Sequence, residues 1–300
     1  MYIYKHRFSS RSALSIAFLL LVYGATFAQA PAAKPLASNV VEHKLNSKMM
    51  GREMPYRVIL PAGYQDAKST SRHGVIYLLH GLTGHFNNWI DITKVEEYAL
   101  SSKFIIVTPE GDNGWYTDSV SKPNDKYESY IIKELIPEIE AKYRTIADRD
   151  NRMIAGLSMG GYGATKFGLK YPEMFSLIGA FSGALGAAAY SEKNAATAGR
   201  GIDTIMGPEG SEGRASNDIF KLVRDLTPEK IKALPFIYQS CGTEDFLIQN
   251  NRDFMMLLVE KKVPHEYRQH PGAHNWIFWD DQIREFLDVA TRRKALSDKR

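Results

Sequence analysis

The chain has 300 residues, of which 44% are hydrophobic and 24% are charged, a composition typical of a globular protein with one large core. Residues 1–30 contribute most of the formal net charge of +4, because they hold three of the 38 basic residues and no acidic one. The rest carries 35 basic and 34 acidic side chains, so it lacks the positive charge that would attract nucleic acid. Cys241 is the only cysteine, which excludes an internal disulfide.

The first thirty residues have the three-part pattern of a secretory signal peptide. Three basic residues precede an apolar run at 13–27, and the small residues around Ala28 and Ala30 suit cleavage. A membrane anchor is the alternative, but the apolar run is shorter than the roughly 20 residues that a spanning helix needs. We therefore expect a secreted or periplasmic protein that has no membrane contact once residues 1–30 are removed.

The mature chain is expected to start with a flexible leader at 31–39, where two prolines and several small residues occur. A single domain should follow at 40–300. Its first two strands, at 40–49 and 53–60, are joined at Gly51 and predict an antiparallel hairpin.

Short apolar runs then alternate with longer helical patterns. The runs expected to be strands are 74–80, 103–109, 152–156, 176–182 and 235–241, with a further strand at 265–269, and the expected helices are 127–143, 159–170, 250–262 and 276–292. Apolar strands of this kind are buried on both faces, and their alternation with helices indicates parallel crossovers. The sequence therefore predicts an α/β fold with a mostly parallel central sheet, an antiparallel N-terminal hairpin and helices on both faces.

One long connection, at 186–234, interrupts this alternation and is rich in Gly, Ala and Ser. Long connections in compact domains tend to be functional or mobile. We expect this segment either to form a partial cap over a site or to run across the surface.

A glycine-flanked serine follows the expected strand at 152–156, within the sequence RMIAGLSMGGY. Ser158 lies between Gly156 and Gly160, a spacing typical of a tight strand-to-helix turn that bulky neighbours would crowd. Such a turn exposes the serine hydroxyl as a nucleophile and directs the Met159 N–H toward the oxygen that becomes negative when an ester carbonyl is attacked. The motif alone is weak evidence, but the strand before it and the helix after it supply the context that it requires.

A serine hydroxyl needs a base, and hydrolases with this turn place the acid and then the histidine after the serine in the chain. His265, His270 and His274 are the histidines C-terminal to Ser158. His274 follows the loop after the strand at 265–269, where open α/β sheets place active residues, so we predict it to be the base.

The acid is expected in the segment SCGTEDF at 240–246, again just after a strand. We predict Asp245, which would hold the imidazole in the right tautomer and stabilise its protonated form. Glu244 is the alternative acid. If it does not serve as the acid, we expect it to be a solvent-exposed charged residue of this loop.

The second oxyanion donor should come from YLLHGLTG at 77–84, because the loop after this strand turns toward the nucleophile. The Leu82 N–H would then act together with that of Met159. His80 is expected to be structural, and His85 to lie at the surface or at the entrance of the site. The sequence shows no metal-binding or phosphate-loop motif, so neither a metal nor a cofactor is predicted.

These segments resemble a family of esterases that includes the esterase D/S-formylglutathione hydrolases, tributyrin esterases, feruloyl esterases and mycobacterial mycolyltransferases. The resemblance covers nearly all of the mature chain and rests on LLHGLTGHFNNW at 78–89, GWYTDS at 114–119, YESYIIKELIPEIEAKYRT at 127–145, GLSMGGYGA at 156–164, CGTEDFL and GAHNW. It implies an α/β-hydrolase fold, a Ser158–His274–Asp245 triad and an oxyanion hole of the Leu82 and Met159 amides. It also implies that Trp115 and Tyr116 border the acyl or alcohol group, with aromatic core packing as the alternative.

We therefore expect a serine carboxylic ester hydrolase that acts through an acyl-enzyme on short-chain, aryl or carbohydrate-linked acyl esters. Two alternatives share the scaffold: hydrolysis of the thioester S-formylglutathione, which a signal peptide disfavours, and acyl transfer to a sugar alcohol. A non-catalytic binding protein of this shape would be expected to lack part of the triad or the flanking glycines, and all of these are present.

Overall fold

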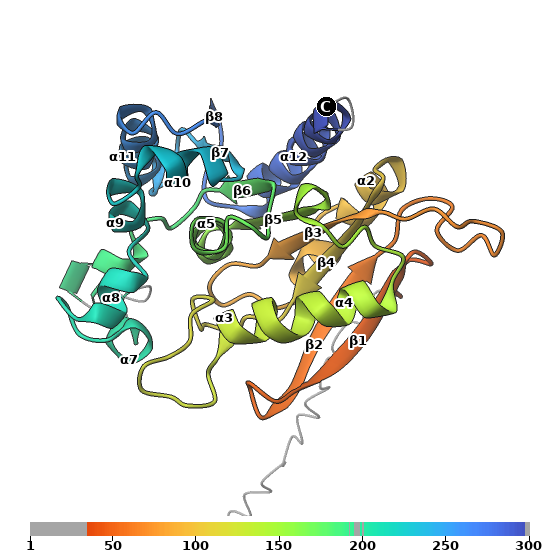
Figure 1. Ribbon diagram of the computed structural model, residues 1–300, viewed down its shortest axis with the longest axis horizontal. Helices are drawn as coiled ribbons and strands as arrows, with labels where there is room; N and C mark the ends of the chain where they lie inside the picture. The colour runs from red at the N-terminus through yellow and green to blue at the C-terminus, as the bar shows by residue number, and fades with distance from the viewer. Residues whose placement is uncertain (1–34, 192, 195–198, 200, 298–300) are drawn as a thin grey trace, which may run out of the picture. The chain divides into compact units, whose positions relative to one another are not determined.

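An eight-stranded sheet forms the centre of the computed structural model, which describes residues 35–191, 193–194, 199 and 201–297 (Figure 1). The signal peptide expected at 1–30, the start of the leader and residues 298–300 lie outside the described residues. Among the described helices, none combines the length and the apolar character that crossing a membrane requires.

The strand order is β1-β2-β4-β3-β5-β6-β7-β8. The first two strands pair antiparallel and β2 is also antiparallel to β4, whereas every later pair is parallel. The strands are β1 (Val40–Ser47), β2 (Arg52–Ile59), β3 (Gly74–Leu79), β4 (Phe104–Pro109), β5 (Arg152–Leu157), β6 (Leu177–Phe181), β7 (Phe236–Gly242) and β8 (His265–His270). The predicted mostly parallel sheet with an antiparallel N-terminal hairpin is thus confirmed.

Helices cover both faces of the sheet. Successive side chains of a strand point to opposite faces and so enter two separate cores, one on each face. In β3, Tyr77 belongs to the first core and Leu78 to the second. The first core is covered by α3 (Tyr127–Tyr130), α4 (Ile136–Lys142), α5 (Met159–Lys170) and α11 (Ile248–Glu260). The second is covered by α1 (Asn88–Ile92), α2 (Val95–Ser101) and α12 (Trp276–Ser297).

The helix predicted at 127–143 is present, but it contains a π-helical turn at Ile131–Leu135 between α3 and α4. Pro137 is the second residue of α4, two positions after the last residue of this turn. Because proline has no N–H, the regular hydrogen-bond pattern cannot pass through it unchanged.

The connection at 186–234 contains more helix than its weak sequence signals suggested. It forms a 3-10 turn (Ala187–Ala189), α7 (Ile202–Met206), α8 (Glu212–Ser216), α9 (Ile219–Arg224) and α10 (Pro228–Ala233). These helices are too short for a clear periodicity, but Ser211, Asp218 and Thr227 each cap one by accepting a backbone N–H three residues later. Figure 1 shows α7 and α8 together at the lower left, below α9, and α9 lies beside α11.

Hydrogen bonds hold the described residues that directly precede β1. The Asn39 side chain donates to the carbonyls of Leu60 and Glu96, and the Val40 N–H donates to the Ala37 carbonyl. These three hydrogen bonds fix the chain just before β1.

Candidate active site

Ser158 occupies the turn between β5 and α5 in a conformation that is costly for any residue with a side chain. Its φ is 51° and its ψ is −115°. The turn needs glycine at both flanking positions, because a side chain would clash there. A Cβ added at Gly160 would lie 2.5 Å from the Leu79 carbonyl oxygen, and one at Gly156 would lie 2.5 Å from Gly160. Strained backbone of this kind persists where the surrounding structure holds it, and it presents the serine hydroxyl above the sheet.

The structure brings the three residues predicted as a triad together, from three separate loops. The Nε2 atom of His274 lies 3.0 Å from the Oγ atom of Ser158, and its Nδ1 atom lies 2.9 Å from Oδ2 of Asp245. Asp245 follows β7 and His274 follows β8, while Ser158 follows β5. Because these strands are parallel, their carboxyl ends lie side by side, and the three loops that follow them meet there.

The Asp245 carboxylate is buried, with 2% of its surface exposed, and it also accepts the Leu247 N–H at 2.8 Å. Burial alone would raise the pKa of Asp245, but hydrogen bonds from His274 and from the Leu247 N–H outweigh this effect and lower it. The carboxylate is therefore ionised at neutral pH, as a group that stabilises an imidazolium must be.

The carboxylate hydrogen-bonded to His274 belongs to Asp245 and not to Glu244, the alternative acid. Its side chain is exposed and accepts hydrogen bonds from the Gly272 N–H and the Thr243 hydroxyl. It therefore fastens the loop that precedes His274 without touching the imidazole.

The residues expected to supply the two oxyanion donors both lie near Ser158. Met159 is the first residue of α5, where the backbone N–H groups have no partner within the helix. Leu82 lines the cavity in front of the serine. The loop of Leu82 packs tightly on the serine turn. No space is left for a side chain at Gly81, where an added Cβ would lie 2.5 Å from the Leu157 side chain.

Glu110, which the sequence interpretation missed, clamps the Leu82 loop at both of its ends. Its Oε1 atom lies 3.2 Å from His80 Nε2, and its Oε2 atom lies 3.2 Å from His85 Nδ1 and accepts the Phe86 N–H at 3.3 Å. Burial alone would raise the pKa of Glu110, but the hydrogen bond and charge of His80 and two backbone N–H groups lower it to about 2. Its position just after β4, beside the end of β3, is the one sequence signal for this role.

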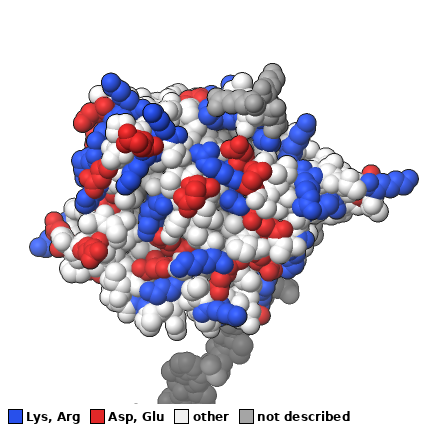
Figure 2. Space-filling view, in the orientation of Figure 1, with Lys and Arg blue, Asp and Glu red and all other residues white. Residues whose placement is uncertain are grey.

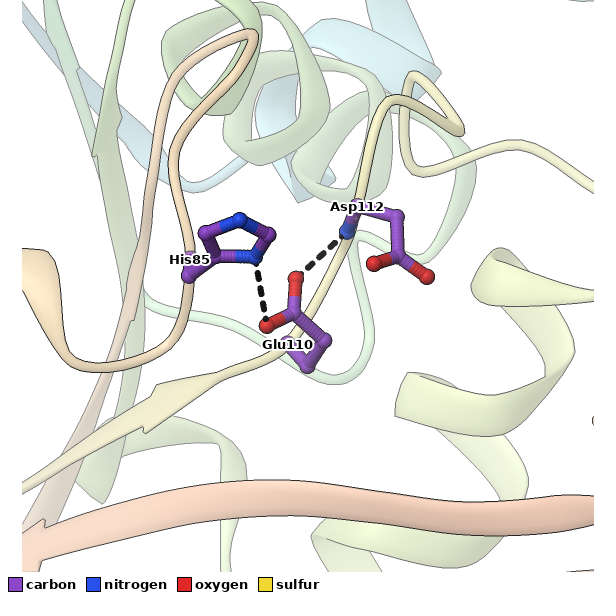
Figure 3. Close-up of side chains that lie close together, drawn as sticks. All are labelled: His85, Glu110 and Asp112. Atoms are coloured by element: carbon purple, nitrogen blue, oxygen red, sulfur yellow. Dashed lines mark hydrogen bonds and ion pairs between the residues drawn. The ribbon is translucent and has the colours of Figure 1, made fainter. Parts of the chain in front are cut away.

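His85, Glu110 and Asp112 each offer one metal-ligating atom, and these atoms lie within 4.8 Å of one another (Figure 3). Protein donors already occupy both carboxylates. Asp112 accepts from Arg52 and from the Tyr127 hydroxyl, each at 2.6 Å, and Glu110 accepts the Asp112 N–H at 2.7 Å. These hydrogen bonds account for the cluster without an ion.

A cavity of about 470 Å³ opens at Ser158 and His274. Trp115 lines it together with Tyr190, and their rings meet edge to face with centroids 6.0 Å apart. Of the described residues in 186–234, Tyr190 is the one that borders this cavity. The remaining lining residues are Gly81, Leu82, Thr83, Gly84, Asn88, Leu157, Ala184, Phe246, Leu247, Asn275, Trp276 and Trp279.

Tyr116 differs from the expectation that it borders the substrate. Its ring is fully buried, and its hydroxyl donates to the His80 carbonyl at 3.0 Å, beneath the Leu82 loop. Both Trp115 and Tyr116 have positive φ values, 51° and 50°. Both rings are buried in the first core, but of the two only Trp115 also lines the cavity.

A mostly parallel sheet with a serine on a strand-to-helix turn, and with an aspartate and a histidine on later loops of the same edge, defines an α/β-hydrolase. The family model described as "Putative esterase" matches residues 47–288, so the chain belongs to this esterase family.

Individual relatives agree with this assignment. The chain is 30% identical over 254 residues to an acetyl esterase of Caldicellulosiruptor saccharolyticus, covering 81% of this chain and 95% of that protein. A solved ferulic acid esterase is 29% identical with a TM-score of 0.72, covering 85% of this chain and 98% of that one. A fluorophosphonate-binding serine hydrolase of Staphylococcus aureus is 26% identical with a TM-score of 0.73, covering 84% and 97%. The chain is a serine ester hydrolase.

Proposed function

We propose that this protein is an exported carboxylic ester hydrolase that forms an acyl-enzyme at Ser158 and acts on short-chain, aryl or carbohydrate-linked acyl esters. One observation carries the mechanism: Ser158 Oγ, both nitrogens of His274 and the carboxylate of Asp245 form a continuous hydrogen-bonded series with contacts of 3.0 and 2.9 Å. This is the arrangement that turns a serine hydroxyl into a nucleophile.

In the acylation step, Ser158 Oγ bonds to the ester carbonyl carbon while its proton passes to His274 Nε2. The carbonyl oxygen becomes an oxyanion and accepts hydrogen bonds from the Leu82 and Met159 N–H groups. His274 then gives the proton to the alcohol oxygen as the bond between that oxygen and the acyl carbon breaks. Asp245 accepts a hydrogen bond from the His274 Nδ1–H and stabilises the imidazolium throughout.

Water completes the cycle. It attacks the acyl-enzyme while His274 Nε2 accepts one of its protons, and the proton returns to Ser158 Oγ as the acid leaves. The cavity of about 470 Å³ supports acyl esters of small size, and the similarity to an acetyl esterase and a ferulic acid esterase supports short-chain and aryl acyl groups.

The proposal is tested by hydrolysis of a panel of esters and by labelling with a fluorophosphonate. The panel runs from acetate to decanoate aryl esters and adds feruloyl esters, acetylated xylan and S-formylglutathione. Ser158→Ala should lower kcat by about 10⁴- to 10⁶-fold with the fold intact, and it should abolish labelling at Ser158. Retention of most ester hydrolysis by this variant, or faster turnover of the thioester than of every ester, would overturn the proposal.

Export is the part of the proposal that rests on the sequence of residues 1–30 alone. Expression of the whole chain in a bacterial host, followed by mass spectrometry of the periplasmic and extracellular fractions, should yield a protein that begins just after Ala30. An intact N-terminus in the cytoplasmic fraction would contradict export and leave the proposed chemistry untouched.

A further inference from the structure

An exposed aromatic ring lies directly on the imidazole of His274. Phe246 follows Asp245 in the loop after β7, and its ring centroid lies 4.5 Å from that of His274. Phe246 lines the cavity and is 76% exposed. Trp276 and Trp279 line the cavity near the same histidine, and the Trp279 ring lies 4.9 Å from the imidazole.

Ile277 shows that exposure alone is not informative. It is 80% exposed and close in sequence to His274, but it does not line the cavity. Single exposed apolar side chains of this kind are common on protein surfaces. Phe246 differs because it is exposed into the cavity and touches the proposed base.

The proposed reaction fixes what must lie beside Phe246. His274 Nε2 has to reach the alcohol oxygen of the ester, at a hydrogen-bond distance of about 3 Å, in order to protonate it. The carbon atoms attached to that oxygen therefore lie next to the imidazole, within reach of the Phe246 ring. The oxyanion points instead toward Leu82 and Met159, which leaves the acyl group the remaining wall, formed by Trp115 and Tyr190.

We infer that Phe246 forms the alcohol-side subsite of this enzyme and selects alcohols that carry a six-membered ring, aromatic or pyranose, whose flat apolar face covers the exposed phenyl ring. This inference rests on the proposed function, because it assumes that His274 protonates the leaving alcohol. Contacts between two aromatic rings contribute about 0.5–1.5 kcal/mol beyond simple burial, so the selectivity for an aromatic alcohol should be about 3- to 10-fold, and we expect a similar size for a pyranose.

The experiment uses three acetates that differ only in the alcohol: ethyl acetate without a ring, benzyl acetate with an aromatic ring, and methyl 6-O-acetyl-glucopyranoside with a pyranose ring. All three give the same acetyl-enzyme, so differences in kcat/KM report contacts of the alcohol during acylation. Phe246→Ala in the full-length protein should lower kcat/KM about 3- to 10-fold for one or both ring-bearing esters, and change it less than about twofold for ethyl acetate. Ile277→Ala, the matched surface variant, should change none of the three.

A loss for benzyl acetate alone assigns the subsite to aryl alcohols, and a loss for the pyranoside alone assigns it to sugars. An equal loss for all three esters means that Phe246 only supports His274, and no loss for any of them means that the ring contacts no substrate; either result overturns the inference. Ser158→Ala separates this outcome from failure of the proposed function, because that failure would appear as hydrolysis of ethyl acetate without Ser158.

Discussion

The Oε1 atom of Glu110 lies 3.2 Å from the Nε2 atom of His80, at the base of the loop that carries Leu82. The other carboxylate oxygen accepts the Phe86 N–H at the far end of this loop and lies 3.2 Å from His85 Nδ1. A single buried side chain on the neighbouring strand end therefore holds both ends of the segment that supplies the second oxyanion donor. Its role can be separated experimentally from that of the triad.

Glu110→Gln should lower kcat by about 10- to 100-fold and leave KM nearly unchanged. An amide can accept at only one of its two polar atoms, so one end of the Leu82 loop loses its partner. Removing one oxyanion donor outright costs about 10²- to 10³-fold, which sets the upper limit. The measurement is kcat and KM for ethyl acetate, together with the inhibition constant of a trifluoromethyl ketone that forms a tetrahedral adduct with the serine.

Glu97→Gln is the matched control, since it removes the same charge from an exposed position on α2. It should change neither kcat nor the affinity for the ketone. Unchanged ketone affinity in Glu110→Gln would mean that the clamp does not position the oxyanion loop.

The same carboxylate should make stability depend on pH in the acidic range. Its pKa falls from 4.5 to about 2 on folding, so ionisation favours the folded state. The resulting stability is fully present above about pH 4.5 and is lost as the pH falls toward 2, with a size of roughly 3 kcal/mol. The free energy of unfolding in urea, measured between pH 2.5 and 6, should therefore decline more steeply in the unmodified protein than in Glu110→Gln. Parallel curves would contradict the assignment.

Asp245→Asn should lower kcat by about 10³- to 10⁴-fold, because an amide favours the wrong imidazole tautomer and does not stabilise the imidazolium. Glu244→Gln is the control next to it in the chain. Its amide oxygen can still accept the Gly272 N–H, so kcat should fall less than about threefold. Steady-state kinetics on one aryl acetate compare the two variants, and a larger loss in Glu244→Gln would exchange their roles.

The sequence was sufficient to predict the parallel strands and the loops of Ser158, Asp245 and His274, because both depend on chain order and on apolar runs that are local features. It did not reveal Glu110, whose partners are backbone N–H groups and histidines about 25 to 30 residues away in the chain. The difference between Trp115 and Tyr116 was also hidden. Both rings enter the core, and the pattern of two adjacent aromatic residues does not tell which of them also lines the cavity.

Lys166 should be needed for stability, because it is a buried cation that joins three parts of the fold. Its Nζ donates to the Tyr116 carbonyl at 2.8 Å and to Asn217 at 3.1 Å, and lies 3.0 Å from Glu128. Lys166→Met should lower the free energy of unfolding by about 3 kcal/mol, since the Tyr116 carbonyl and Asn217 lose this buried donor and Glu128 loses one of its two cationic partners. Lys170→Met removes a partly exposed partner of the same glutamate and should cost about 1 kcal/mol or less. Equal losses in urea unfolding would contradict this difference.

Tyr190→Ala should widen the wall that we place on the acyl side of the cavity. Removing the ring opens space beside Trp115, and each additional methylene group of an acyl chain that becomes buried there contributes about 0.8 kcal/mol. Two such groups would raise the ratio of kcat/KM for octanoate over acetate by about tenfold, measured with one constant alcohol. Phe246→Ala, on the alcohol side, should leave this ratio unchanged. If Phe246→Ala changes the ratio and Tyr190→Ala does not, the acyl group lies beside His274 and the alcohol beside Trp115, which reverses the orientation of the ester in the cavity.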